Sequence, residues 1–238
     1  MIREAPSQTS RRDGSGTAGG RRAVLFDVDG VLLDSMAVYR RVWESWSIVC
    51  GLDPEAVWAL TPGRRPADTI EAVAPHLDLT DQIGKLTSLL DSELERLRAM
   101  PGAAQLLASL PRQSWALVTS NTEPVVRTCF ARLGLPSPQL VVDADAVEFG
   151  KPHPEGFLKA ASALDVLPAR CLVIEDATAG VAAALAAGMT VFGINSTEPL
   201  DPLPGAHRTF PSLRAASTLI QEWLRAPQSV PGSPPPTR

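Results

Sequence analysis

Short apolar runs recur along this chain, and segments with a helical spacing of apolar residues lie between most of them. Each run is rich in branched residues and is followed by polar or turn-forming residues, as in a buried strand of a parallel sheet. The alternation predicts an α/β fold with a doubly wound parallel sheet. The predicted strands are residues 23–26, 115–118, 140–142, 171–174 and 190–194, and the predicted helices between them include 123–133, 154–164 and 179–187.

The gap between the first two predicted strands is far longer than an ordinary crossover. We therefore predict that residues 36–100 form an inserted α-helical cap domain, and that residues 21–35 and 101–225 form the α/β core. The helical patterns inside the gap cover residues 36–49, 54–60, 66–73 and 80–100.

An aromatic stripe marks the first of these cap helices. Tyr39, Trp43 and Trp46 share one helical face. The spacing favours a hydrophobic seam within the cap over a surface that stacks on a substrate.

The two ends of the chain differ in composition from the rest. Residues 1–20 are mostly Ser, Thr, Gly and Arg, and residues 226–238 are rich in proline, so both are predicted to be disordered tails.

A net charge of −4 argues against a nucleic-acid partner. Apolar stretches stay shorter than the roughly 20 residues that span a membrane. The three cysteines are widely separated, which favours reduced thiols. No signal peptide is recognised, so a cytoplasmic protein is expected. The oligomeric state is left open.

An acidic pair follows the first predicted strand. Asp27 and Asp29 are two residues apart, so their side chains point to the same side if the strand continues. Open α/β sheets bind ligands at the carboxyl ends of their strands. Because two close carboxylates repel each other, they need a cation, a shared proton, or both.

Polar residues also follow the other predicted strands. Thr119, Ser120 and Asn121 come after the second strand, where a hydroxyl and turn amides can hold a phosphate oxygen or, alternatively, cap the next helix. Lys151 lies between glycine and proline in a chain with only three lysines, and it is either a cation for a phosphoryl group or a surface residue.

A second acidic pair, Glu175 and Asp176, follows the fourth strand. Together with Asp27 and Asp29 it makes an oxygen-rich cluster that suits Mg²⁺ rather than zinc. Because Mg²⁺ prefers sites that it shares with phosphate, the cluster points to a phosphorylated substrate.

These residues resemble the haloacid dehalogenase superfamily, specifically its phosphatase branch with a helical cap. The resemblance covers about residues 21–225 and rests on four motifs in the family's order and spacing. The motifs are residues 27–35, 118–121, 150–152 and 173–177. The resemblance implies a Rossmann-like core beneath the cap.

The resemblance also implies roles for single residues. Asp27 is expected to be the nucleophile that forms an aspartyl phosphate, and Asp29 to protonate the leaving alcohol and then activate water. Thr119, aided by the turn at Ser120 and Asn121, is expected to bind the phosphoryl group.

Positive charge at the expected site would come from Lys151 and from Mg²⁺. Lys151 is expected to offset negative charge on the phosphoryl group. Asp27, the backbone carbonyl of Asp29, and Asp176 are the expected magnesium ligands, with Glu175 in or beside the coordination shell.

The cap segment around residues 61–70 is similar to that of sugar- and polyol-phosphate phosphatases, which commonly carry His-Gly-x-Arg there. Pro62 replaces the histidine, so its role is absent. Arg65 matches the arginine and is the stronger candidate for contacting the distal part of a substrate, with Arg64 the weaker one. A solvated loop with helix-capping charges is the alternative.

The resulting expectation is a Mg²⁺-dependent phosphatase that hydrolyses a small phosphorylated sugar or polyol. A phosphomutase similar to β-phosphoglucomutase shares the four motifs and stays open as an alternative. A third interpretation is a phosphate-binding module without turnover.

Overall fold

The computed structural model describes residues 20–195 and 203–226. The two predicted tails lie outside this part of the chain, apart from residues 20 and 226. Within it, one sheet has the strand order β5-β4-β1-β6-β7-β8, and all neighbouring strands are parallel. Its strands are β1 (Ala23–Phe26), β4 (Trp115–Val118), β5 (Val141–Val142), β6 (Cys171–Glu175), β7 (Thr190–Ile194) and β8 (Arg208–Phe210).

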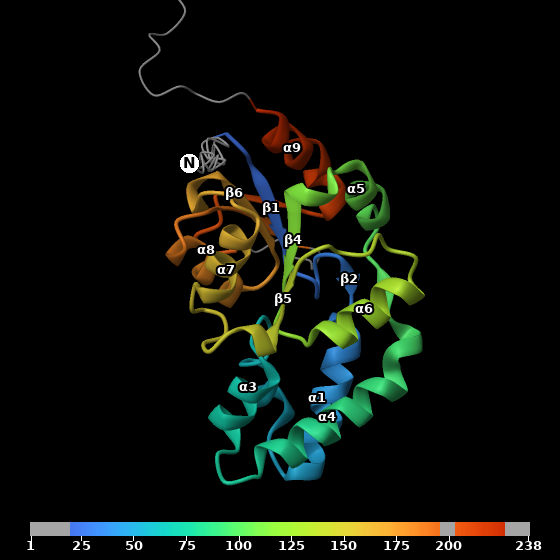
Figure 1. Cartoon of the computed structure of the whole chain (residues 1–238). Helices are drawn as coiled ribbons and strands as arrows, with labels where there is room; N and C mark the ends of the chain where they lie inside the picture. The colour runs from blue at the N-terminus through green and yellow to red at the C-terminus, as the bar shows by residue number, and fades with distance from the viewer. Residues whose placement is uncertain (1–19, 196–202, 227–238) are drawn as a thin grey trace, which may run out of the picture.

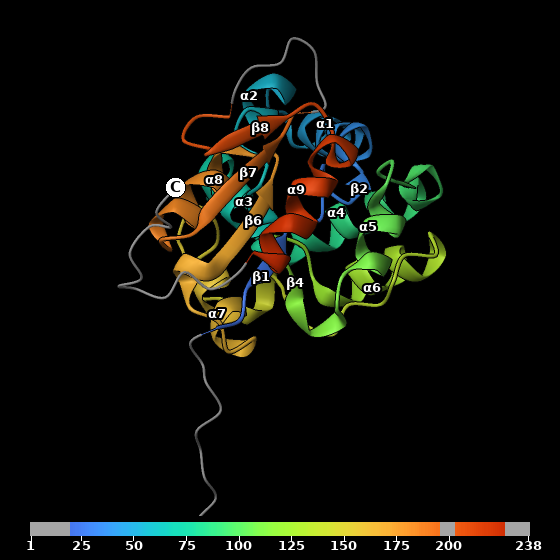
Figure 2. The same cartoon turned by 90° about the horizontal axis from the view of Figure 1, so that it is seen from above.

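Helices cover both faces of this sheet (Figure 2). On one face, α7 (Glu155–Ala163) and α8 (Thr178–Ala186) bury Phe157 and Val181. On the other face, α5 (Ala103–Ser109), α6 (Glu123–Arg132) and α9 (Leu213–Arg225) bury residues such as Phe130 and Ile220. The core also contains three short 3₁₀ helices, η2 (Arg112–Ser114), η3 (Ala144–Ala146) and η4 (Pro168–Arg170). The predicted doubly wound parallel sheet is therefore confirmed.

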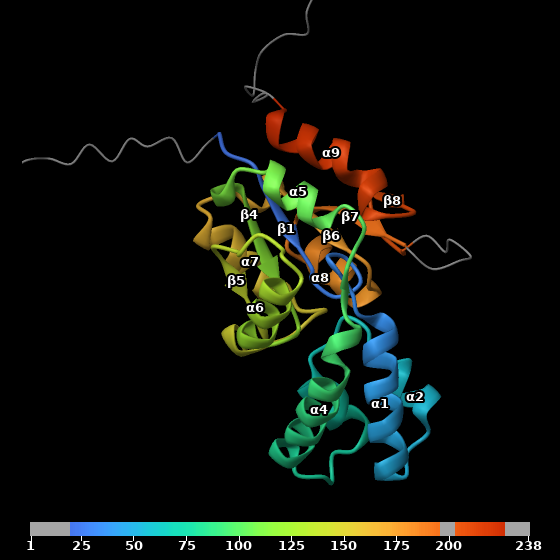
Figure 3. The ribbon, with the colours of Figure 1, turned by 90° about the vertical axis from the view of Figure 1, so that its right-hand side faces the viewer.

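The inserted helices lie beyond the carboxyl end of the sheet and form the cap (Figures 1 and 3). They are α1 (Met36–Cys50), α2 (Pro54–Trp58), α3 (Pro66–Val73) and α4 (Leu79–Glu93), followed by η1 (Leu94–Arg96). Trp43 and Trp46 pack edge to face and are buried in the cap, and the indole nitrogen of Trp46 donates to Gln82 at 3.2 Å. Their placement agrees with the predicted seam, whereas Tyr39 faces the site described below.

The predicted helix over residues 80–100 is wrong at its carboxyl end. Helix α4 ends at Glu93, and Arg98–Ala99 forms strand β3. This strand pairs antiparallel with β2 (Leu33–Asp34), so the chain segments that enter and leave the cap lie side by side. The pairing with a distant segment replaces the local helical preference.

Among the described residues, none of the helices combines the length and the apolar character that crossing a membrane requires.

Candidate active site

The carboxyl end of the central strand β1 carries the first acidic pair. The backbone N–H of Asp27 donates to Ile174 O at 3.0 Å and so extends the pairing of β1 with β6. Gly30 then turns the chain with φ of 79°, and a Cβ atom there would lie 1.7 Å from Asp176 Oδ2. Only glycine combines this backbone conformation with so close a neighbour. The turn thus packs the first acidic segment against Asp176.

Lys151 is the buried cation of the site. Its Nζ donates to Asp27 Oδ1 at 2.5 Å, to Glu175 Oε1 at 2.6 Å and to Val118 O at 3.3 Å. Burial by itself lowers the pKa of Lys151, but the charges of Asp27 and Glu175 reverse this and raise it above its ordinary value. The surface alternative for Lys151 is therefore wrong, since the ammonium is buried at 7 % exposure with three acceptors.

The two residues of the second acidic pair, Glu175 and Asp176, differ in their hydrogen bonds. Glu175 is fully buried, with Oε1 accepting from Lys151 and Oε2 accepting from the backbone N–H groups of Asp176 and Ala177 at 3.0 and 3.1 Å. Gly180 of α8 leaves the space for it, since a Cβ there would lie 1.7 Å from Glu175 Oε1. Because both oxygens of Glu175 already accept hydrogen bonds, Asp176 is the better placed metal ligand of the two.

Negative charge exceeds positive charge in this cluster. Oxygens of Asp27, Glu175 and Asp176 lie within 4.8 Å of one another. Burial raises the pKa of Asp27 to about 8, with Lys151 opposing the rise and Glu175 adding to it. Burial, together with the charges of Asp27 and Glu175, also raises the pKa of Asp176. An all-oxygen donor set with surplus negative charge fits a hard dication such as Mg²⁺.

The loop after β4 places three side chains around Asp27 and Asp29, each with a different partner. Thr119 is buried, and its Oγ1 accepts only the N–H of Asn121 at 3.1 Å among the bonds described. Its hydroxyl does not cap helix α6, because Asp143 Oδ2 accepts the N–H of Glu123 at 2.7 Å instead. The hydroxyl proton of Thr119 thus has no acceptor among the bonds of the described residues.

The side chains of Ser120 and Asn121 each donate hydrogen bonds to neighbouring residues. Ser120 Oγ donates to the carbonyl of Gly63 in the cap at 2.9 Å. Asn121 Nδ2 donates to Asp29 Oδ2 at 2.5 Å and to the hydroxyl of Tyr39 at 2.8 Å. Ser120 therefore joins core to cap, and Asn121 orients Asp29.

Asp29 sits in surroundings unlike those of Asp27. Burial raises the pKa of Asp29, and hydrogen bonds from Ser35 and Asn121 oppose the rise. Its Oδ1 is buried without a hydrogen-bond partner among the described residues. Asp27 faces the ammonium of Lys151, whereas Asp29 faces an amide, so the two carboxyl groups are suited to different tasks.

The two cap arginines also differ. Arg65 forms a double hydrogen bond with Asp68, at 2.9 and 2.7 Å, and a third with Val147 O at 3.2 Å. Arg64 lines the small pocket that holds Asp27, Asp29 and Asp176, and its buried Nε has no partner among the described residues. Arg64 thus lines the pocket of the acidic cluster, whereas Arg65 lines the larger cavity described next, and the expected contact of Arg65 with the distal part of a substrate stays a prediction.

Two adjoining cavities lead away from the acidic cluster. The smaller, of about 60 Å³, lies between Asp27, Asp29, Asp176 and the cap loop. The larger, of about 400 Å³, lies between the cap and helix α6, and we call it the chamber. Both are lined by Tyr39 and Asn121. The arrangement offers two carboxyl groups in contrasting surroundings and a buried cation at one end of a space that is large enough for a small metabolite.

Comparison with known proteins agrees with this geometry. A model of the family described as haloacid dehalogenase-like hydrolase matches residues 21–188. The chain belongs to the haloacid dehalogenase-like hydrolases. Each of the four motifs expected from the sequence lies within the matched segment.

Named relatives of this hydrolase include phosphatases. Hexitol phosphatase A of Escherichia coli is 37 % identical over 180 residues, covering 74 % of this chain and 83 % of that protein. Glycerol-1-phosphate phosphohydrolase 2 of Saccharomyces cerevisiae is 34 % identical over 191 residues, covering 75 % of this chain and 76 % of that protein. A crystal structure of β-phosphoglucomutase from Clostridium difficile superposes with a TM-score of 0.73 at 22 % identity, covering 86 % of this chain and 97 % of that one.

Some contacts of this hydrolase leave no mark in the sequence pattern. Tyr39 belongs to the aromatic stripe, yet its hydroxyl accepts from Asn121 beside Asp29. Asp143 caps α6 from the end of β5, and Gly63 meets Ser120 through its carbonyl. A polar hydroxyl at the first position of the stripe is the one signal that distinguishes Tyr39 from its tryptophan neighbours.

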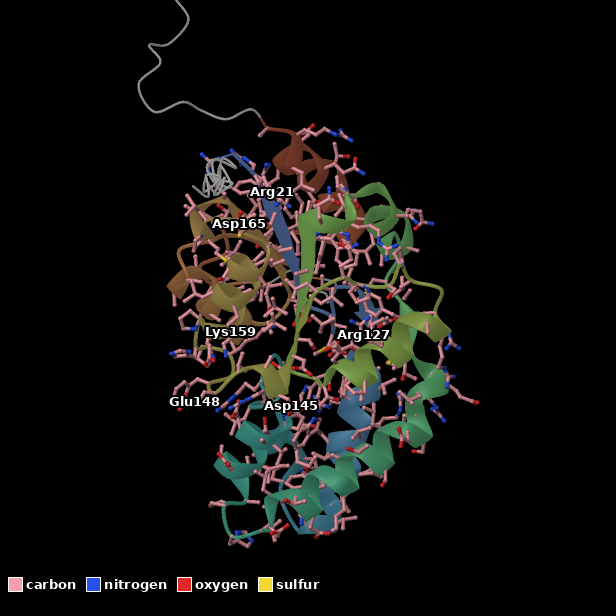
Figure 4. The ribbon with its side chains drawn as sticks, viewed as in Figure 1. Arg21, Arg127, Asp145, Glu148, Lys159 and Asp165 are labelled. Carbon is pink, nitrogen blue, oxygen red and sulfur yellow. The ribbon has the colours of Figure 1, made fainter. Side chains whose placement is uncertain are left out.

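Removing the buried cation of this hydrolase should destabilise the fold. We expect Lys151→Met to lower the free energy of unfolding by about 3–5 kcal/mol, because it leaves Asp27 and Glu175 buried without their partner. Urea unfolding at neutral pH measures the change. Lys159→Met is the matched control. Lys159, labelled in Figure 4, is half exposed where it pairs with Glu155, so the loss of its charge should cost little. Equal losses in the two variants would contradict the prediction.

Proposed function

We propose that this protein is a Mg²⁺-dependent phosphatase that hydrolyses a small phosphorylated sugar or polyol through an aspartyl-phosphate intermediate. The chain is a phosphoric monoester hydrolase of its family. The observation that carries the proposal is the pair of aspartates in contrasting surroundings, with Asp27 bound to Lys151 and Asp29 bound to Asn121. The names of the two phosphatase relatives support the substrate class.

In the first chemical step, a carboxylate oxygen of Asp27 attacks phosphorus. The new Asp27 oxygen–phosphorus bond forms as the bond from phosphorus to the alcohol oxygen breaks. Asp29 donates its proton to that alcohol oxygen, so a neutral alcohol leaves. Thr119 donates to a phosphoryl oxygen during the transfer, and the positive charge of Lys151 offsets the negative charge of the phosphoryl group.

In the second step, Asp29 takes a proton from water, and the water oxygen attacks phosphorus. The bond between phosphorus and Asp27 breaks, which releases inorganic phosphate and restores both carboxyl groups. Splitting hydrolysis in this way replaces one difficult displacement by two easier ones. The raised pKa of Asp29 suits a group that must hold a proton in one step and accept one in the next.

Asp27, Asp176 and the backbone carbonyl of Asp29 would hold the magnesium ion, with Glu175 beside them. When bound, Mg²⁺ supplies positive charge that offsets the charge of the phosphoryl group and of the clustered carboxylates. Arg64 is the cap residue that we propose for contact with the substrate, since it lines the small pocket. Arg65 joins α3 to the core through Asp68 and Val147, and because it also lines the chamber it stays a candidate for contact with the distal part of the substrate.

The test is release of inorganic phosphate from a panel of sugar and polyol phosphates, with and without EDTA. We expect release that EDTA suppresses and that added Mg²⁺ restores. Release that is insensitive to EDTA would contradict the metal requirement, and no release from any phosphomonoester would contradict the proposal as a whole.

The phosphomutase alternative is supported by a weaker likeness in sequence, since β-phosphoglucomutase of Bacillus subtilis is 28 % identical over 194 residues against 37 % for hexitol phosphatase A. Isomerised sugar phosphate without free phosphate would favour it in the same assay. The interpretation as a phosphate-binding module without turnover is disfavoured by the contact of Asp27 with Lys151 and the placement of Asp29.

We also propose a cytoplasmic location, which the free thiols of Cys50, Cys129 and Cys171 support.

A further inference from the structure

The chamber beside the active site has largely apolar walls. Its cap side is formed by Leu86 and Leu90 on one face of α4, by Leu94 of η1 and by Trp43 of α1. Val125 of α6 faces them from the core side. Leu86, Leu90 and Trp43 are buried even though they line an open space. A ligand part that fills the chamber therefore contacts mainly hydrocarbon.

The chamber adjoins the small pocket at the acidic cluster. Tyr39, Ser120 and Asn121 line both spaces. A phosphoryl group that reacts with Asp27 must lie in the small pocket, whose volume of about 60 Å³ leaves little room for more. The alcohol part of the substrate consequently points into the chamber, which is about 400 Å³ in volume.

The charged groups of the chamber do not suit a second phosphate. Among the described residues that line it, Arg65 is the one cation, and its guanidinium is held by Asp68 and by Val147 O. Asp91 and Asp145 add negative charge to the lining. Figure 4 shows Asp145 where η3 approaches the cap. An anionic group at the far end of a substrate would meet carboxylates rather than a free cation.

We propose that the preferred substrate is a monophosphate whose alcohol part is uncharged and carries an apolar substituent that binds in the chamber. This inference rests on the proposed phosphatase function and narrows its substrate class. An alkyl- or aryl-substituted sugar or polyol phosphate fits the walls better than a bare one does, and a bisphosphate fits worst. Burial of each methylene group in such a space strengthens binding about fourfold.

The test uses alkylphosphonates, in which a carbon–phosphorus bond prevents hydrolysis, so that binding is measured apart from turnover. Methyl-, butyl- and hexylphosphonate are titrated into the full-length protein with Mg²⁺ by isothermal titration calorimetry. We expect the dissociation constant to fall about fourfold for each added methylene group. Equal dissociation constants across the series, or no binding at all, would overturn the proposal.

Two neighbouring positions on α4 provide a matched pair of variants. Thr87 lines the chamber and Ser88 does not; both are exposed, and each hydroxyl donates to a carbonyl one turn earlier. We expect Thr87→Glu to weaken hexylphosphonate binding at least about tenfold and to leave methylphosphonate unchanged, whereas Ser88→Glu should match the wild type. Equal effects of the two changes on hexylphosphonate would place the alkyl chain elsewhere and overturn the proposal.

Charge discrimination is tested with hexane-1,6-bisphosphonate. We expect it to bind at least about tenfold more weakly than hexylphosphonate, and equal or tighter binding would overturn the exclusion of a second phosphate. The phosphate-release assay separates this inference from the proposed function. If the protein releases no phosphate but its dissociation constants still fall along the phosphonate series, the proposed phosphatase function is rejected. If it releases phosphate but the dissociation constants are equal along the series, the inference of an apolar substrate is rejected.

Discussion

Phosphate release should fall by at least about 10⁴-fold in kcat when Asp27 is changed to Asn, on every phosphomonoester that the wild-type protein hydrolyses. Asparagine keeps the shape of the side chain and its acceptor oxygen for Lys151, so the fold is retained. Its amide is a far weaker nucleophile than a carboxylate and cannot form the aspartyl phosphate. A colorimetric phosphate assay with a concentrated enzyme stock measures the residual rate.

The matched control for this prediction is Asp165→Asn. Asp165 is exposed, lies far from the cap (Figure 4) and has a φ of 55°, a conformation that asparagine tolerates well. The control should retain wild-type activity and stability. Activity of Asp27→Asn above about a tenth of the wild-type value would show that another group attacks phosphorus.

The sequence pattern predicts the parallel strands and the cap helices because each depends on local periodicity. Strand β1 and helix α3 occupy the predicted residues without change, and β6 extends one residue further, to Glu175. Apolar runs of this length have few alternatives once they lie between helices. The pattern does not predict strands that depend on pairing with a distant segment. Strands β2 and β3 are two residues each and form because they pair with each other.

The order of motifs along the chain predicts which residues gather at the carboxyl edge of the sheet, but not how they share hydrogen bonds. Lys151 reaches Asp27 across 124 positions of sequence, and a motif with a lysine between glycine and proline indicates that a cation is needed. Asn121 binding to Asp29 and Ser120 binding to Gly63 are choices among several possible acceptors. They are decided by side-chain packing between core and cap, which no local pattern encodes.

Arg64 and Arg65 show the same limit at adjacent positions. Both precede Pro66, and both carry a guanidinium of equal reach. Asp68, one turn into α3, accepts two hydrogen bonds from the guanidinium of Arg65. Arg64 has no such partner among the described residues and lines the small pocket at the acidic cluster. The motif matches Arg65 by position, and its expected contact with the distal part of a substrate stays a prediction, because Arg65 lines the chamber.

Changing Asp29 to Asn should affect the two chemical steps differently. With an alkyl phosphate, we expect the rate to fall by about 10²–10⁴-fold, because the alcohol oxygen departs without a proton. With p-nitrophenyl phosphate, the leaving phenolate needs no proton, so the first step should be nearly unaffected. The substituted side chain retains an acceptor oxygen for the amide of Asn121, which keeps the local structure intact.

Rapid-mixing measurement of p-nitrophenolate distinguishes these steps. We expect the Asp29→Asn variant to give an initial burst at a rate close to that of the wild type and then to stall, because no carboxylate is left to activate the water that attacks the aspartyl phosphate. Asp165→Asn again serves as the control and should show wild-type kinetics throughout. If the variant loses both the burst and the steady-state rate, Asp29 also holds the phosphoryl group or the metal. If the variant turns over alkyl phosphates at the wild-type rate, Asp29 is not the general acid and base. The burst therefore separates proton transfer by Asp29 from the attack by Asp27, which a steady-state rate alone combines.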